Sequence, residues 1–244
     1  MKKETQVLLK GVLKNSLMSI IIFTIVLVFL FLVGLKDNIK GIAIASGIVG
    51  SAYILTIRNP NNYFGFYLGI LSSILLGIQF YLIDNFELFF VYFFIFIPSQ
   101  AISIYTWKKG NKQDGLSSEL NPSFLSFRNF LIVTACFLLL FIADIFIARE
   151  VSHAHAPQVS LSIQIFSAIF VAASILANIL LIKKKTDSWY YWFIFSIAGI
   201  ILNILYKDYV TVTLFVIYLL INSEAGLMWI KKTPKENYGW LKGK

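Results

Sequence analysis

Long apolar segments separated by short polar connections follow one another along nearly the whole chain. An α-helix needs about 20 apolar residues to cross ~30 Å of hydrocarbon. We therefore predict eight membrane-spanning helices, at 17–35, 39–57, 63–83, 88–107, 130–148, 159–182, 189–206 and 209–230. The first is too long for a signal-peptide core and should remain as a helix. The second is short and rich in Gly, Ala and Ser, which favours a closely packed interior helix.

The connections alternate in charge. Basic residues gather in the N-terminal segment, in the loops at Arg58, 108–128 and 183–185, and in the C-terminal tail. The intervening connections are acidic or mixed, apart from the first, at 36–40, which departs from the pattern. Because Lys and Arg are enriched in cytoplasmic loops, we predict a multi-pass protein of the cell inner membrane with both termini in the cytoplasm. The polar, turn-rich loop 108–128 is interpreted as a flexible cytoplasmic linker.

Composition narrows the class of protein further. Hydrophobic residues make up 58% of the 244 residues and charged residues only 14%, which a soluble domain of this size could not accommodate. The alternating ~10-residue segments of a β-barrel do not occur. The net charge of +9 would suggest nucleic acid in a soluble protein. Here it reflects cytoplasmic lysines, so we expect contact with membrane lipids and not with nucleic acid. The single cysteine, Cys136, excludes a disulfide framework.

Polar and aromatic positions recur between the two halves of the chain. Four pairs share a spacing of seven residues: Ser72/Gln79 and Gln100/Trp107 in the first half, and Ser196/Asn203 and Asn222/Trp229 in the second. We interpret the halves as parallel three-helix repeats joined by one connecting helix, a known transporter plan; chance similarity is the alternative. The predicted divisions are an N-terminal segment and extra helix (1–36), a first repeat (37–109), a linker and connecting helix (110–150), a second repeat (151–232) and a tail (233–244).

One face of the seventh predicted helix combines aromatic and hydrogen-bonding side chains. Its members recur at i, i+3, i+7, i+10 and i+14: Trp189, Trp192, Ser196, Gly199 and Asn203. Indole faces and polar groups together suit a neutral or delocalised-cation heterocycle. Trp189 follows a basic loop at the membrane boundary, where aromatic belts occur, so we interpret it mainly as a belt residue. Trp192 lies one turn deeper and is interpreted as a substrate contact.

Further polar residues lie inside the predicted spans, where they must face the bundle interior or an aqueous cavity. They are Ser72, Gln79, Ser99, Gln100, Asn178, Ser196, Asn203, Asn222, Ser223 and Glu224. Gln79, Gln100 and Asn222 are candidate substrate contacts; the alternative is that intramembrane amides join helices. Glu224 lies about 200° around its helix from Asn222. It could pair with a nearby lysine, bind another helix, or meet a cationic substrate.

Signals for catalysis, cofactors or metals are weak. His153 and His155 alternate in a predicted outer loop without further ligands, so we expect no metal site. No Walker motif, phosphate-binding glycine loop or nucleophile–base set occurs, so we expect neither an enzyme nor a cofactor and name no catalytic residue. Asp144, near the outer end of the fifth span, is a single carboxylate that could serve proton coupling.

Several stretches resemble the PnuC-type vitamin transporters, the nicotinamide riboside transporter family. They are ANILLIKKKTDSWYYW at 177–192, YKDYVTVTLF at 206–215, MWIKK at 228–232 and IPSQAISIYTW at 97–107. The shared features include an Ala-Asn pair before a basic loop, a WxxW pair opening the next helix, and a Gln-containing helix ending in Tyr and Trp. The resemblance covers roughly residues 40–232. The family often has an acidic or amide residue where this chain has Ser196.

The resemblance implies an all-α integral membrane protein, with an N-terminal extra helix and a 3+1+3 parallel-repeat core similar to an enlarged SWEET-type fold. Family members move nicotinamide riboside, thiamine or related compounds down their gradients, and cytoplasmic phosphorylation traps the product. The family's substrate residues map onto Trp189, Trp192 and Gln100. Related proteins can form trimers, so a homotrimer and a functional link to a cytoplasmic kinase are expected.

The predicted function is therefore facilitated uptake of nicotinamide riboside. Transport of thiamine or another nucleoside-like vitamin precursor is the near alternative, which a buried carboxylate at Glu224 would favour. From a different class of protein, a non-transporting membrane scaffold or receptor subunit is the other interpretation.

Overall fold

The protein is built almost entirely of helices in the computed structural model, which describes residues 3–32, 41–82, 86–113, 122–155 and 160–239. The elements are α1 (Lys3–Leu32), α2 (Gly41–Ile57), α3 (Gly65–Leu82), α4 (Phe86–Phe90), the π-helix η2 (Val91–Phe96), α5 (Ile97–Gln113), α6 (Phe127–His155), α7 (Leu161–Ile182), α8 (Ser188–Leu205), α9 (Tyr209–Lys232) and the 3₁₀ turn η3 (Lys235–Asn237). Within these ranges, β pairing is limited to an isolated bridge between Ser123 and Lys185.

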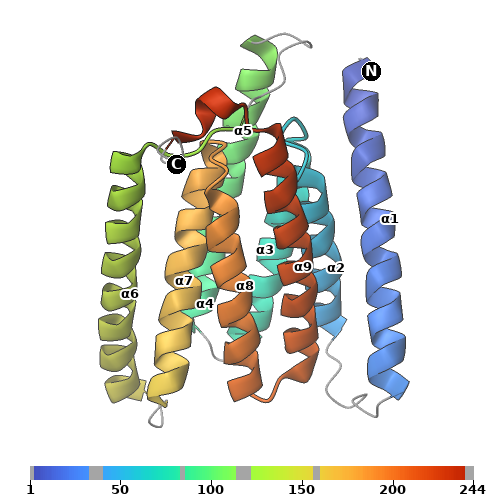
Figure 1. The fold of residues 1–244 in the computed structure, drawn as a ribbon. Coiled ribbons are helices and arrows are strands. Elements are labelled where there is room, and N and C mark those ends of the chain that lie inside the picture. Colours follow the sequence, from blue (N-terminus) through green and yellow to red (C-terminus); the bar gives the residue numbers. More distant parts are fainter. Residues whose placement is uncertain (1–2, 33–40, 83–85, 114–121, 156–159, 240–244) are drawn as a thin grey trace.

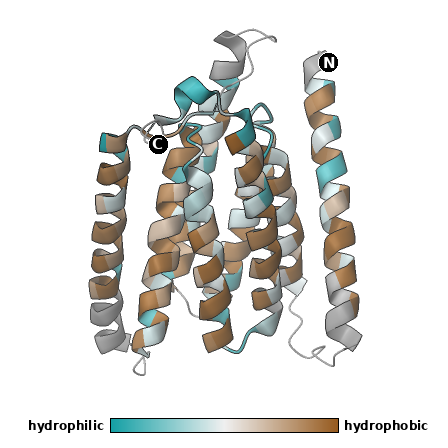
Figure 2. Ribbon diagram, viewed as in Figure 1, coloured by the Kyte–Doolittle hydropathy of each residue, from teal (hydrophilic) through white to brown (hydrophobic). Residues whose placement is uncertain are grey.

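Seven of the described helical segments are long and apolar enough to cross a membrane, the segment Phe86–Lys109 being made of α4, η2 and most of α5. This confirms the prediction of an all-helical membrane protein. The remaining predicted span, α2, has 17 residues, slightly fewer than a full crossing usually needs. Its crossing therefore stays a prediction. Apolar residues dominate the length of the helices, and hydrophilic residues gather at the end where α1 begins and α9 finishes (Figure 2).

The helices form two groups of three. We call α2, α3 and the α4–η2–α5 helix the first triplet, and α7, α8 and α9 the second triplet. In each group the middle helix, α3 or α8, packs on the other two. The two triplets interlock, because α2 contacts α9 and α5 contacts α7. Helix α1 packs on α2, and α6 packs on α7. These two helices lie at opposite edges of the bundle (Figure 1).

Small residues allow α2 to lie close to its neighbours. A Cβ atom built at Gly47 would lie 2.5 Å from the ring of Phe23 in α1 and 2.7 Å from a methyl group of Leu214 in α9. Both separations are shorter than a carbon–carbon contact, so a larger residue at this position would require the Phe23 and Leu214 side chains to shift. The predicted close packing of this Gly- and Ala-rich helix is confirmed.

The third helix of the first triplet changes its hydrogen-bonding register near Pro98. Proline has no N–H, so it cannot donate to the carbonyl of Phe94 four residues earlier. The preceding Ile97 N–H bonds to the carbonyl of Tyr92, five residues back, as in a π-helix. Tyr92 and Phe96, both in η2, are buried in the bundle. The corresponding helix of the second triplet, α9, is a regular α-helix.

The loop before α6 differs from the predicted flexible linker. Helix α5 continues to Gln113, and residues 114–121 lie outside the described ranges. Phe124 and Leu125 are buried, and the Leu125 N–H donates to the carboxylate of Asp187 at 2.8 Å. The end of the loop is therefore packed against the start of α8, because its apolar residues find a buried position there. Helix α6 also extends to His155, so the two histidines belong to a helix and not to an outer loop.

Candidate binding site

A cavity of about 40 Å³ lies between the two triplets. Its wall is mainly aromatic, with a few polar groups: Tyr53, Tyr92, Phe96, Trp192, Phe195 and Tyr218, together with Ser72, Ser73 and Gln100. Among the described residues that line it, none is Lys, Arg, Asp or Glu. A water molecule needs ~10–15 Å³ of such space, so the cavity holds roughly three waters. A heterocyclic ligand would enter only after side chains or helices move apart.

Trp192 is the largest side chain of the wall. Its ring meets Phe96 edge-on, with centroids 6.4 Å apart, and Phe195 edge-on at 5.2 Å. Phe96 belongs to η2 and Phe195 to α8, so the first triplet and the second both contribute to this aromatic cluster. Aromatic faces attract flat rings and delocalised cations. The wall is therefore suited to a planar heterocycle.

Gln100 is the amide of the wall, and it is only 1% exposed. Its Nε2 donates to the hydroxyl of Tyr53 and to Oδ1 of Asn178, each at 3.2 Å. Asn178 belongs to α7, so Gln100 joins the first triplet to the second. The Asn178 Oδ1 also lies 3.3 Å from the hydroxyl of Ser99, which has a closer acceptor in the carbonyl of Phe96 at 2.8 Å. The Asn178 Nδ2 donates to the carbonyl of Ser174 at 2.9 Å.

Asn222 holds the corresponding position in the second triplet but bonds differently. Its Nδ2 donates to Ser196 Oγ at 3.0 Å and to the carbonyl of Trp192 at 3.4 Å. Ser196 in turn donates to the same carbonyl at 2.8 Å. Asn222 and Ser196 thus lie behind Trp192, in the contact between α8 and α9, and neither belongs to the described cavity lining.

Two polar atoms of the wall are buried without a hydrogen-bond partner among the described residues: the Oε1 of Gln100 and the indole Nε1 of Trp192. A buried polar group without a partner costs about 1–3 kcal/mol. One is an acceptor and the other a donor, so a ligand carrying both kinds of group would satisfy them.

Two tryptophans close the basic end of the bundle, where α5, α7 and α9 finish. Trp107 of α5 donates its indole N–H to the carbonyl of Leu181 in α7 at 3.3 Å. Trp229 of α9 donates to the carbonyl of Arg58, just after α2, at 3.0 Å. The last helix of each triplet therefore bonds to the end of the first helix of the other. The two indoles lie 6.0 Å apart.

Comparison with known proteins decides the family. Residues 40–231 match the nicotinamide mononucleotide transporter family. The chain belongs to the nicotinamide mononucleotide transporter family. This confirms the PnuC-type resemblance, and the chain is a multi-pass membrane transporter and not an enzyme.

A solved structure gives the fold. The crystal structure of the vitamin B3 transporter PnuC superposes with a TM-score of 0.65 at 17% sequence identity, over 92% of this chain and 97% of that one. At this identity the match shows that the two proteins share a fold. The comparison with curated proteins gave no match.

The structure brings only part of the predicted site together. Trp192 and Gln100 line the cavity. Asn203 is partly buried and donates to the carbonyl of Gly199 at 2.7 Å, and Gln79 is buried with its Oε1 unpartnered in the described structure. Neither amide lines the cavity, although spacing alone gave them the same status as Gln100.

Trp189 is not a membrane-belt residue, and that prediction is wrong. Its side chain is only 3% exposed, and its ring packs edge-on against Trp229 with centroids 5.5 Å apart. A belt residue would face lipid, whereas Trp189 starts α8 inside the closed basic end. Position near a basic loop does not determine the direction of a side chain, and that of Trp189 points into the bundle.

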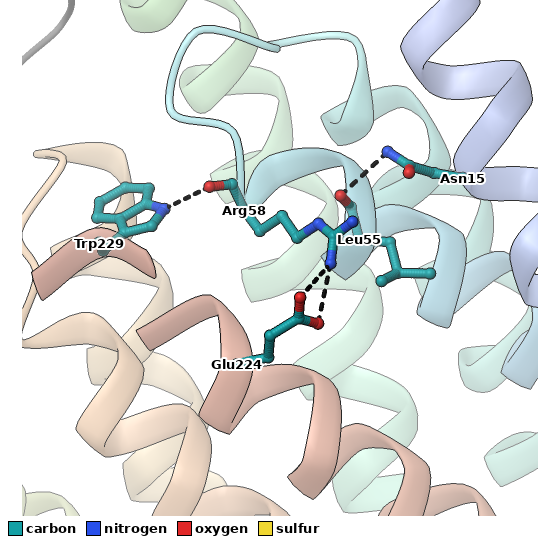
Figure 3. Close-up of polar contacts among 5 residues, drawn as sticks. All are labelled: Asn15, Leu55, Arg58, Glu224 and Trp229. Carbon is teal, nitrogen blue, oxygen red and sulfur yellow. Dashed lines mark hydrogen bonds and ion pairs between the residues drawn. The ribbon is translucent and has the colours of Figure 1, made fainter. Parts of the chain in front are cut away.

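Glu224 lies away from the cavity, at the basic half of α9. Its carboxylate pairs with the guanidinium of Arg58 at 2.8 and 2.9 Å, and 55% of the side chain is exposed. Figure 3 shows this pair beside the Trp229 bond and the Asn15 bond to Leu55. Of the alternatives for Glu224, the structure supports binding to another element, namely the end of α2. It does not support a lysine on the same helix or a position beside the substrate.

The remaining wall residues were missed by sequence reasoning. Tyr53, Tyr92, Phe96 and Tyr218 are aromatic residues in apolar helices, and such residues are common in spans that face lipid. Only their burial separates them from the exposed aromatics. Asn178, which bonds Gln100 but does not line the cavity, did carry a signal, because it is a polar residue within a long apolar helix and belongs to the Ala-Asn pair of the family resemblance.

Proposed function

We propose that the protein mediates facilitated uptake of nicotinamide riboside across the cell inner membrane. The observation that carries the proposal is the uncharged, aromatic-walled cavity between the triplets, with one unpaired acceptor and one unpaired donor. A pyridinium ring suits stacking on Trp192, and hydroxyl and carboxamide groups suit Gln100. The family's nicotinamide compound and the vitamin B3 carried by the structural relative support the choice of this vitamin.

Charge favours the riboside over the mononucleotide. A phosphate carries one to two negative charges and is stabilised by Arg, Lys or a helix N-terminus. The described lining offers no cationic side chain, so burying a phosphate there would be strongly unfavourable. Thiamine stays the alternative because it also has a cationic aromatic ring. It loses the support of Glu224, whose carboxylate is paired with Arg58 outside the cavity.

Transport would proceed by movement of one triplet against the other. In this interpretation the triplets are the two parallel repeats, α6 is the connecting helix and α1 is the extra N-terminal helix. If α2 crosses the membrane, these helices make eight spans in the 3+1+3, SWEET-like plan. The basic end, proposed to face the cytoplasm, is held by the two indole bonds and by the Arg58–Glu224 pair. Release of substrate inside would require these contacts to separate.

Phosphorylation inside the cell would make uptake effectively one-way. A facilitator only equalises concentrations, but a kinase that adds phosphate to the riboside makes a product that a cavity without cationic lining would not carry out. The family resemblance also supports a homotrimer, which light scattering on the detergent-purified protein would check.

Uptake by proteoliposomes tests the proposal. Liposomes with the protein should accumulate labelled nicotinamide riboside to equilibrium, without added energy, and should take up the mononucleotide at least about 10-fold more slowly. Trp192→Ala should reduce uptake at least about 10-fold, because the stacking surface is lost. Phe193→Ala, on the exposed side of the same helix, is the matched control and should retain uptake. No uptake above empty liposomes would favour a scaffold or receptor subunit.

A further inference from the structure

We propose that Asn178 is a positioning residue that fixes the amide of Gln100 with only its carbonyl oxygen available to a ligand. The site thereby selects a riboside with a primary carboxamide over the same riboside with a carboxylate. This inference rests on the proposed function. It assigns a role to Asn178, which does not touch the substrate, and it specifies which polar group the substrate must carry.

The orientation of Asn178 is set by the backbone. A backbone carbonyl can only accept a hydrogen bond, and the carbonyl of Ser174 lies 2.9 Å from one end of the Asn178 amide. That end must therefore be the NH₂ group. The opposite end, Oδ1, then points toward Gln100 and accepts from its NH₂ group.

The Asn178 amide fixes the orientation of the Gln100 amide. Because Asn178 presents an oxygen, the facing end of Gln100 must be its NH₂ group. Its two hydrogens are matched by two acceptors, Asn178 Oδ1 and the Tyr53 hydroxyl. The Gln100 oxygen is left without a partner among the described residues. It lies beside Gly69, where an added Cβ would be 2.9 Å from it, and Gly69 also lines the cavity.

Gln100 and Trp192 both line the cavity, and each carries a buried atom without a partner among the described residues, an acceptor oxygen in Gln100 and a donor N–H in Trp192. A primary carboxamide carries both an N–H donor and a carbonyl acceptor, so it can satisfy both groups. A carboxylate has only acceptors and a negative charge, and it would face the Gln100 oxygen without any hydrogen between them. A site built to hydrogen-bond a donor discriminates strongly against an analogue that lacks it.

Binding to the purified, unmodified protein gives the first test. Calorimetry would compare three ribosides of similar size: the 3-carboxamide, the 3-carboxylate, and the 3-acetyl compound, which keeps a neutral carbonyl but has no N–H. We expect the carboxylate to bind at least ~10-fold more weakly and the acetyl compound at least ~5-fold more weakly than the carboxamide. Equal affinity for all three overturns the inference and leaves the proposed function standing. No binding of the carboxamide overturns both.

The role of Asn178 is tested by the ratio of carboxamide to carboxylate affinity, which a mere loss of folded protein does not change. Asn178→Ala frees the Gln100 amide to rotate and offer its NH₂ group to a carboxylate, so the ratio should fall at least threefold. Asn203→Ala is the matched control, since Asn203 also donates to a carbonyl four residues earlier but does not line the cavity. Its ratio should equal that of the unmodified protein. An unchanged ratio in Asn178→Ala, or an equal fall in both variants, contradicts the assignment.

Discussion

The two triplets carry an amide at the same distance before a tryptophan, yet the two amides hold different parts of the molecule together. Gln100 bonds across to Asn178 in the other triplet. Asn222 bonds to Ser196 and to the Trp192 backbone within its own triplet. A movement of one triplet against the other would break the first set of bonds and leave the second intact. The comparison suggests that one amide responds to the relative position of the triplets, while the other stiffens the wall that carries Trp192.

Helix geometry accompanies this difference. The helix that carries Gln100 contains the π-helical segment η2, which ends just before Pro98 and buries Tyr92 and Phe96. The helix that carries Asn222 has no such segment in its described length. π-helical segments are frequent at functional sites. Both triplets line the cavity, and the first shapes its part of the wall with a π-helical segment that the second lacks in its described length.

Replacement of the two amides is the largest expected effect and tests the comparison itself. Gln100→Leu removes the acceptor of the cavity and leaves Asn178 without one donor, so the affinity for nicotinamide riboside should fall about 10- to 100-fold. Asn222→Leu should change the affinity less than about threefold but lower the melting temperature, because it breaks the α8–α9 contact. Calorimetry and thermal unfolding of both variants would measure this. Equal losses of affinity would show that the two triplets do not differ in role.

The tryptophan bonds at the basic end should have intermediate and matched effects. Trp107→Phe and Trp229→Phe each keep an aromatic ring and remove one indole N–H bond between the triplets. Each should destabilise the closed arrangement by about 0.5–1.5 kcal/mol, seen as a lower melting temperature and a changed uptake rate at unchanged affinity. An effect in only one variant would mean that the reciprocal bonds are not equivalent.

The ion pair between Arg58 and Glu224, beside the tryptophan bonds, should have the smallest effect on binding and uptake. The Arg58–Glu224 pair is partly exposed, and such pairs contribute about 0–1 kcal/mol. Glu224→Gln should leave the affinity for riboside unchanged and alter the uptake rate less than about fivefold. Glu236→Gln, an exposed carboxylate in η3, is the control. A fall in riboside affinity in Glu224→Gln but not in Glu236→Gln would show that Glu224 contributes to substrate binding.

The sequence predicted the helical class, because length and apolar composition are local properties of the chain. It also shows an amide seven residues before a tryptophan in each half, at Gln100 and at Asn222. It could not separate Gln100 from Gln79 or Asn203, because spacing gives the face of a helix but not which neighbour that face meets. Trp189 shows the same limit, since its buried contact with Trp229 joins two helices distant in sequence.

Burial of the end of the loop before α6 was also not predicted from the sequence. Its surroundings are polar and turn-rich, and only Phe124 and Leu125 indicated packing. The hydrogen-bond partners of their backbone N–H groups, Asp187 and Asn237, lie more than sixty residues away in the sequence. Long-range contacts of this kind are set by the tertiary fold and leave little local signal.

The central claim is that an uncharged cavity between the triplets binds a riboside and excludes its phosphate. The most direct measurement is a calorimetric titration of the purified protein with nicotinamide riboside and, separately, with nicotinamide mononucleotide. The account predicts saturable binding of the riboside and at least about 100-fold weaker binding of the mononucleotide, because no cationic side chain of the described lining can balance the phosphate. Equal or tighter binding of the mononucleotide would contradict it.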